Sequence, residues 1–111
     1  MDNTATSRKY RTANWAEVRG PVVDIQFIDN VLVLKVHTND KHNGKTNPTD
    51  HIIKIRSDTG LFSVAKLTQA GDLVEVCGPI ATDRSIVPSK FENFSFYSDN
   101  RINALRQEVS V

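Results

Sequence analysis

Four cationic or titratable side chains recur at two-residue spacing in two successive apolar segments of the sequence. Lys35 and His37 lie in the first segment, and Lys54 and Arg56 lie in the second. Residues two apart point to the same side of a β-strand, so each pair occupies one strand face. If the two strands are neighbours, the four side chains form a row that can hold the phosphates of a nucleic-acid backbone. The alternative is that these side chains are merely solvated on an exposed strand face.

The polar segment between the two apolar segments adds further cationic candidates. Residues 39–50 read NDKHNGKTNPTD, which is longer than most hairpin connections, so we expect a long loop. Lys41 and Lys45 lie within it, and His51 follows it directly. These residues would let the loop close over a bound strand as a cationic clamp. The alternative is a solvated loop tip.

Aromatic side chains near cations are candidates for stacking on bases, because every base has a face on which a ring can stack. Arg11 and Trp15 lie near the amino terminus, and Tyr97 ends the last apolar segment, out of phase with Phe94 and Phe96. A lone tryptophan is usually well buried, so we favour the alternative that Trp15 closes one end of the core. Phe94 and Phe96, which share a strand face, are expected in the core.

The hydrophobic pattern predicts the elements that position these residues. We expect strands over residues 18–28, 31–37, 51–56, 72–80 and 91–97. Asp29-Asn30 predicts a tight turn, and Gly20-Pro21 predicts a bulge or bend in the first strand. A short helix is expected to be capped by Ser57-Asp58-Thr59 and to end at Gly71. Alternation directs one set of side chains inward, namely Leu32, Leu34, Val36, Ile53 and Ile55.

Three strands, a short helix and two further strands predict an all-β domain: a five-stranded Greek-key barrel of the OB-fold type, with its helix between strands three and four. We expect the barrel over residues 15–104, a flexible arm over residues 1–14 and a tail over residues 105–111. OB-folds bind ligands across strands two and three and the adjoining loops. The predicted cation row therefore falls on the ligand-binding face.

Three segments resemble the single-stranded DNA-binding protein family of bacteria, phages and plasmids, including its primosomal relatives. Val18-Arg19-Gly20 resembles the family's first strand, and residues 51–56 followed by 61–65 resemble its third strand and helix. Residues 70–78, AGDLVEVCG, resemble the family pattern K-G-D-x-V-x-V-x-G. The resemblance implies sequence-tolerant binding of single-stranded DNA in replication or recombination, and a homo-oligomer, dimeric or tetrameric, with replication proteins as further partners.

The sequence also departs from that family. His51 and Ser57 stand where the family commonly has base-stacking aromatic residues, and the acidic tail of bacterial members is missing. These departures predict salt-sensitive electrostatic binding with little stacking, in a protein of a phage, plasmid or mobile element. Two alternatives stay open: an adaptor that binds proteins of a replication or primosome complex, and an RNA-binding OB domain.

Several classes of function lack their chemistry in this sequence. Lys and Arg number 14 against 13 for Asp and Glu, so any basic surface must arise from local arrangement. No nucleophile motif, paired catalytic carboxylates or metal-ligand spacing is present, so we expect neither an enzyme nor a cofactor or metal site. The single cysteine, Cys77, and the lack of a long apolar run predict a cytoplasmic protein without membrane contact.

Overall fold

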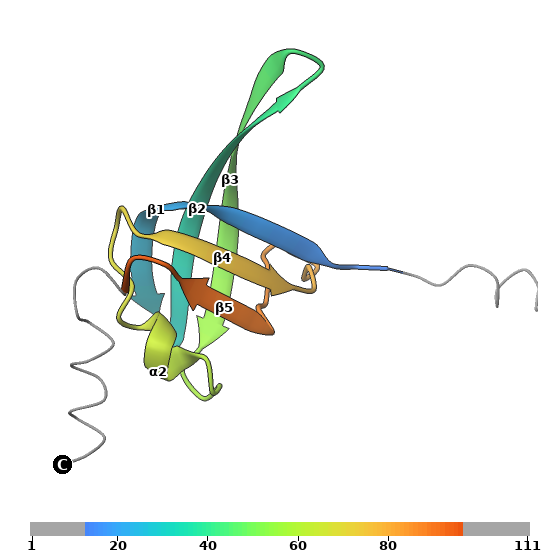
Figure 1. The fold of residues 1–111 in the computed structure, drawn as a ribbon. Helices are drawn as coiled ribbons and strands as arrows, with labels where there is room; N and C mark the ends of the chain where they lie inside the picture. Colours follow the sequence, from blue (N-terminus) through green and yellow to red (C-terminus); the bar gives the residue numbers. More distant parts are fainter. Residues whose placement is uncertain (1–12, 97–111) are drawn as a thin grey trace, which may run out of the picture.

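The computed structural model describes residues 13–96, which form five antiparallel strands wrapped into a barrel (Figure 1). The elements are β1 (Ala16–Ile28), β2 (Val31–His42), β3 (Lys45–Arg56), α2 (Phe62–Ala65), β4 (Leu73–Gly78) and β5 (Lys90–Asn93). The strand order is β3-β2-β1-β4-β5. Ile86, in the segment between β4 and β5, forms a parallel bridge with Ile53 of β3 and so joins the two sides of the sheet. This is the predicted all-β barrel with a short helix between strands three and four.

The core lies between the inward faces of the strands. All five side chains that alternation directs inward are buried, as predicted, and Val74 and Val76 of β4 complete the centre. Phe96 is buried as expected, whereas Phe94 is only partly buried. The expectation for Phe94 is wrong because β5 already ends at Asn93. The amide oxygen of Asn93 accepts a hydrogen bond from the Ser95 N–H at 2.9 Å, which begins a turn and breaks the alternation.

Strand β1 bends sharply because it pairs with two different partners. Residues 16–21 pair with β4, and residues 22–28 pair with β2. The register shifts between Val22 and Asp24, so the bulge lies just after Gly20-Pro21 rather than at this dipeptide. A Cβ atom on Gly20 would collide with the carbonyl oxygen of His37, so the bend requires a glycine where β1 crosses β2.

The segment predicted as a long loop, residues 39–50, instead continues β2 and β3 as a hairpin. Pairing runs without interruption from Val31 opposite Arg56 to His42 opposite Lys45. Asn43 and Gly44 form the two-residue turn with φ of 53° and 78°, which is the conformation that an Asn-Gly pair favours. The segment has no alternation of apolar and polar residues, so hydrophobic periodicity does not predict its strands. This hairpin arm, residues 39–50, projects beyond the barrel (Figure 1).

The helix is shorter than predicted. It spans four residues, starts after Leu61, and has no side-chain cap. The predicted capping residues serve β3 instead: Thr59 bonds the carbonyl of Arg56 through its N–H and its hydroxyl, and Asp58 pairs with the Arg56 side chain. Among the described residues, no helix has the length and hydropathy of a membrane span. The expected tail, and the expected arm apart from residues 13 and 14, lie outside the described residues.

Candidate nucleic-acid interface

The register of β1, β2 and β3 brings the predicted cations onto one surface. Side chains that alternate with the core point outward, so Lys35 lies beside Ile52, and Lys54 lies beside Val33. Arg56 follows at the end of the same row, opposite Val31. We call this surface the outer face; it consists of Asp24, Gln26, Ile28, Val31, Val33, Lys35, His37, Asp50, Ile52, Lys54 and Arg56.

The centre of the outer face is aliphatic. Ile28 is 51% exposed, and Val31, Val33 and Ile52 are half-buried, so the three strands present a continuous apolar floor. A groove of about 330 Å³ lies over this floor, lined by Ile28, Asp29, Val31, Val33 and Lys54. A second groove of about 490 Å³ adjoins it at the β1–β2 turn, lined by Asp29, Asn30, Val31, Arg56, Ser57 and Asp58. An apolar floor beside cations can contact base faces and backbone phosphates together.

Carboxylates lie against most side chains of the predicted row. The Lys54 ammonium lies 2.6 Å from Asp83, and the Arg56 guanidinium lies 2.7 Å from Asp58. The third pair joins His37 Nδ1 to Asp50 Oδ1 at 2.7 Å. Within the part of the chain that the structure describes, Lys35 is the member of the row without an ion pair. The outer face is therefore less positive than the sequence suggests.

The hairpin arm separates its two predicted lysines. Both are exposed, but alternation places Lys41 on the same side as Lys35 and Lys45 on the opposite side. Only Lys41 extends the row of the outer face along the arm. The arm has no apolar residue that could anchor it to the barrel.

The four remaining candidates lie apart from the row or beyond the described residues. His51 pairs with Val36 on the inward-facing side of β3, and its Nε2 lies 3.0 Å from the Thr38 hydroxyl. The expectation that Trp15 closes the core is wrong: it is 60% exposed because it lies just beyond the first β1–β4 pair, Ala16 with Gly78. Its alternative role in stacking stays a prediction. Arg11 and Tyr97 fall outside the described residues.

Two features of this surface were not predicted. The aliphatic floor was visible only as the apolar half of the outward strand faces, and its continuity depends on the Ile28–Val31 pairing across the β1–β2 turn. The second feature is Asp83, which nothing in the sequence pattern marks as a partner of Lys54. It lies 29 positions from Lys54 in the sequence, and only closure of the barrel brings the two together.

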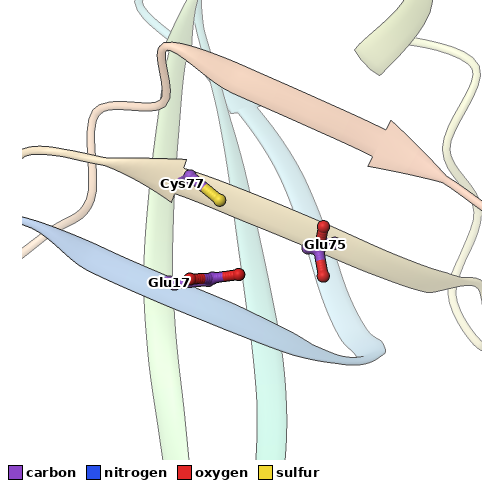
Figure 2. Close-up of side chains that lie close together, drawn as sticks. All are labelled: Glu17, Glu75 and Cys77. Atoms are coloured by element: carbon purple, nitrogen blue, oxygen red, sulfur yellow. The ribbon is translucent and has the colours of Figure 1, made fainter.

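A second cluster of potential ligand atoms lies on β1 and β4, away from the outer face. Figure 2 shows Glu17, Glu75 and Cys77, whose side-chain oxygen and sulfur atoms lie within 4.8 Å of one another. Glu75 already accepts two hydrogen bonds from the Arg19 guanidinium, at 2.6 and 3.0 Å. Burial and the two neighbouring carboxylates raise the pKa of the Cys77 thiol, so it stays protonated. The cluster is accounted for as an ion pair beside a neutral thiol.

Comparison with known proteins identifies the fold. No family model and no curated protein sequence matches this chain. Among solved structures, a small single-stranded DNA-binding protein from Mycoplasma pneumoniae matches with a TM-score of 0.60 and 12% identity, covering 76% of this chain and 90% of its own. The Plasmodium falciparum SSB complex with ssDNA matches at 0.57 and 17% identity, covering 77% and 97%.

A chain of the S. pombe Stn1–Ten1 complex matches with a TM-score of 0.58 and 20% identity, covering 86% of this chain and 68% of that one. At these identities the likeness concerns the fold. The chain is an OB-fold barrel, as predicted from the order of its elements. Its fold is the one that these three structures share.

Proposed function

We propose that this protein binds single-stranded DNA without strong sequence preference, across the outer face and the hairpin arm. The observation that supports this most directly is the aliphatic floor on β1–β3, beside which Lys35, Lys54 and Arg56 lie. This is the region where OB-folds bind their ligands. Two of the matching structures are a single-stranded DNA-binding protein and an SSB complex with ssDNA.

Each part of the outer face has a distinct role in this proposal. Lys35 and Arg56 neutralise phosphates, and Lys41 continues the contact along the arm. The floor contacts the faces of bases, which are alike in being flat and apolar, so binding tolerates any sequence. Hydrogen-bonding groups that would read base edges are not needed, and no catalytic step is involved.

The cellular setting belongs to the same proposal. The resemblance of residues 18–104 to the single-stranded DNA-binding family supports a role in DNA replication or recombination, in the cytoplasm, for a phage, plasmid or other mobile element. It also supports a homo-oligomer. Light scattering tests this expectation. A mass near 12.4 kDa, which is that of a single chain, would contradict a homo-oligomer.

The experiment that tests DNA binding is fluorescence anisotropy with labelled oligo-dT at low salt. Wild type is expected to bind, with weaker binding to duplex DNA of equal length. Lys35→Glu is expected to lose about tenfold or more in affinity, because one contact is replaced by repulsion. Lys66→Glu, an equal change of charge at the exposed end of α2, serves as the control and should bind like wild type. Equal affinity for duplex, or no binding at all, contradicts the proposal.

A second candidate function is that of a protein-binding adaptor. The observation that favours it is the combination of an apolar centre with a rim of paired charges, because protein interfaces share this anatomy. Under this alternative, wild type and Lys35→Glu both bind oligo-dT with negligible affinity. An RNA-binding role is separated by oligo-U: tighter binding to oligo-U than to oligo-dT would favour RNA.

A further inference from the structure

One carboxylate of the outer face comes from outside strands β1–β3. Asp83 lies in the segment between β4 and β5, and its Oδ2 accepts a hydrogen bond from the Lys54 ammonium at 2.6 Å. The segment is fixed against β3 by two backbone hydrogen bonds. The Ile86 N–H donates to Ile52 at 2.8 Å, and the Lys54 N–H donates to Ile86 at 3.0 Å. Asp83 therefore reaches Lys54 from a segment that is part of the closed barrel.

The position of this carboxylate is set on both oxygens. Its Oδ1 accepts hydrogen bonds from the N–H and the hydroxyl of Ser85, at 2.9 and 2.5 Å. Ser85 is itself buried, at 3% exposure, so this anchor is rigid. The Lys54 ammonium and the two Ser85 bonds hold the pKa of Asp83 well below its ordinary range, so it stays ionised across the neutral range.

The other two carboxylate contacts of the outer face, Arg56 with Asp58 and His37 with Asp50, are of a different kind. Arg56 and Asp58 are two residues apart in the chain and mostly exposed, with side-chain exposures of 71% and 63%. His37 and Asp50 are cross-strand neighbours at the base of the hairpin arm. In neither pair does a described residue donate a hydrogen bond to the second carboxylate oxygen. Only Asp83 is held in place independently of the cation that it faces.

We propose that Asp83 occupies the place of a DNA phosphate at Lys54 and thereby sets the affinity and ligand selectivity of the outer face. This inference rests on the proposed function. An anchored carboxylate presents an anionic oxygen at the distance at which a phosphate oxygen would bind the ammonium. The Lys54–Asp83 ion pair must therefore open before a DNA phosphate can bind Lys54. The long, flexible lysine side chain permits this without movement of the anchored segment.

The consequence is selectivity for single strands of DNA over simple polyanions. A polyanion without bases gains little at Lys54, because it merely replaces one carboxylate by another anionic group. A strand that also contacts the aliphatic floor and Lys35 gains enough elsewhere to make the exchange. Asp83 therefore weakens binding of simple polyanions more than binding of single-stranded DNA.

A double-mutant cycle tests this proposal, with anisotropy titrations of wild type, Asp83→Asn, Lys54→Gln and the double variant against oligo-dT. Asp83→Asn is expected to bind about three- to fivefold tighter, the size of an exposed ion pair. Its plot of log affinity against log salt concentration should be steeper by about 0.7, one additional phosphate contact. In the Lys54→Gln background the same change should gain less than about 1.5-fold, because no cation remains to be released.

Glu17→Gln is the matched control, since it removes an exposed carboxylate from β1 away from the outer face. It should leave the affinity unchanged. Asp83→Ser is the second variant, used if thermal melting shows that the asparagine disturbs the turn. Heparin serves as the simple polyanion, and its affinity should rise more than that of oligo-dT in Asp83→Asn.

The outcomes separate this proposal from the proposed function. If wild type binds oligo-dT and Asp83→Asn binds no tighter, the competition is absent although DNA binding stands. The same conclusion follows if Asp83→Asn gains equally in the presence and absence of Lys54, since the carboxylate then acts by general repulsion. If neither wild type nor any variant binds oligo-dT, the proposed function itself fails and takes this inference with it.

Discussion

Gly20 of β1 lies directly against the carbonyl oxygen of His37 of β2, with no room for a side chain between them. This contact lies near the point where β1 changes partner from β4 to β2, two residues before the bulge that starts at Val22. The close crossing turns the first strand around the corner of the barrel. It also brings the β1 half that carries Ile28 alongside β2, which completes the outer face.

The first prediction concerns this crossing. Gly20→Ala places a methyl group against backbone atoms that cannot move without breaking the β1–β2 ladder. We expect a loss of about 1–3 kcal/mol in the free energy of unfolding, as for other overpacked sites. Urea unfolding followed by circular dichroism measures it. Gly60→Ala, at a glycine with open space around it, is the control. A loss below about 0.5 kcal/mol would contradict the inferred tightness of the crossing.

The second prediction concerns the turn of the hairpin arm. Gly44 has φ of +78° with nothing near its missing side chain, so Gly44→Ala introduces only backbone strain, of about 1 kcal/mol. The arm lacks a core of its own, so this strain should open the arm while the barrel keeps its stability. Hydrogen exchange should speed up within residues 39–50 and stay unchanged in β4. Faster exchange throughout the barrel would show that arm and barrel unfold together.

The parts of the fold that the sequence predicts correctly are those that strand alternation controls. Leu34 and Ile53 are buried because each lies in phase with apolar neighbours two residues away, and that period can be seen without tertiary information. The hairpin arm was missed because its two polar faces carry no such period. Its Asn43-Gly44 turn was a visible local signal that was outweighed by the polar composition of the segment.

The parts that the sequence does not predict depend on where the barrel closes. Trp15 is exposed because it lies one residue before the first β1–β4 pair, a boundary that hydrophobicity does not mark. Asp83 meets Lys54 only after Ile86 has joined β3. Strand alternation places Lys35, Lys54 and Arg56 on one face, but their carboxylate partners could not be assigned with them, since Asp83 is distant in sequence from Lys54.

The third prediction concerns the buried thiol. The pKa of Cys77 is raised by burial and then by Glu17 and Glu75. A thiol whose pKa is higher in the folded state contributes stability that is complete below the unfolded-state pKa, about 8.5, and is lost as pH rises above it. Between pH 7 and 10, wild type should therefore lose more stability than Cys77→Ala. Urea unfolding at each pH measures the difference. Parallel curves of stability against pH for the two proteins would show that folding does not raise the pKa of the Cys77 thiol. Alkylation of Cys77 in the folded protein at the rate of a free thiol would agree with that result.

The fourth prediction compares two lysines of the outer face. Lys35 has no ion pair among the described residues, whereas Lys54 is held by Asp83. If both contact DNA equally, Lys35→Gln and Lys54→Gln should each reduce the slope of log affinity against log salt by about 0.7. Because Asp83 competes at Lys54, we expect the full reduction only for Lys35→Gln and a smaller one for Lys54→Gln. Anisotropy titrations at several salt concentrations measure both slopes. A larger reduction of the slope for Lys54→Gln than for Lys35→Gln would mean that the Lys54–Asp83 ion pair opens freely. It would also mean that Lys35 contributes less to phosphate binding than its lack of an ion pair implies.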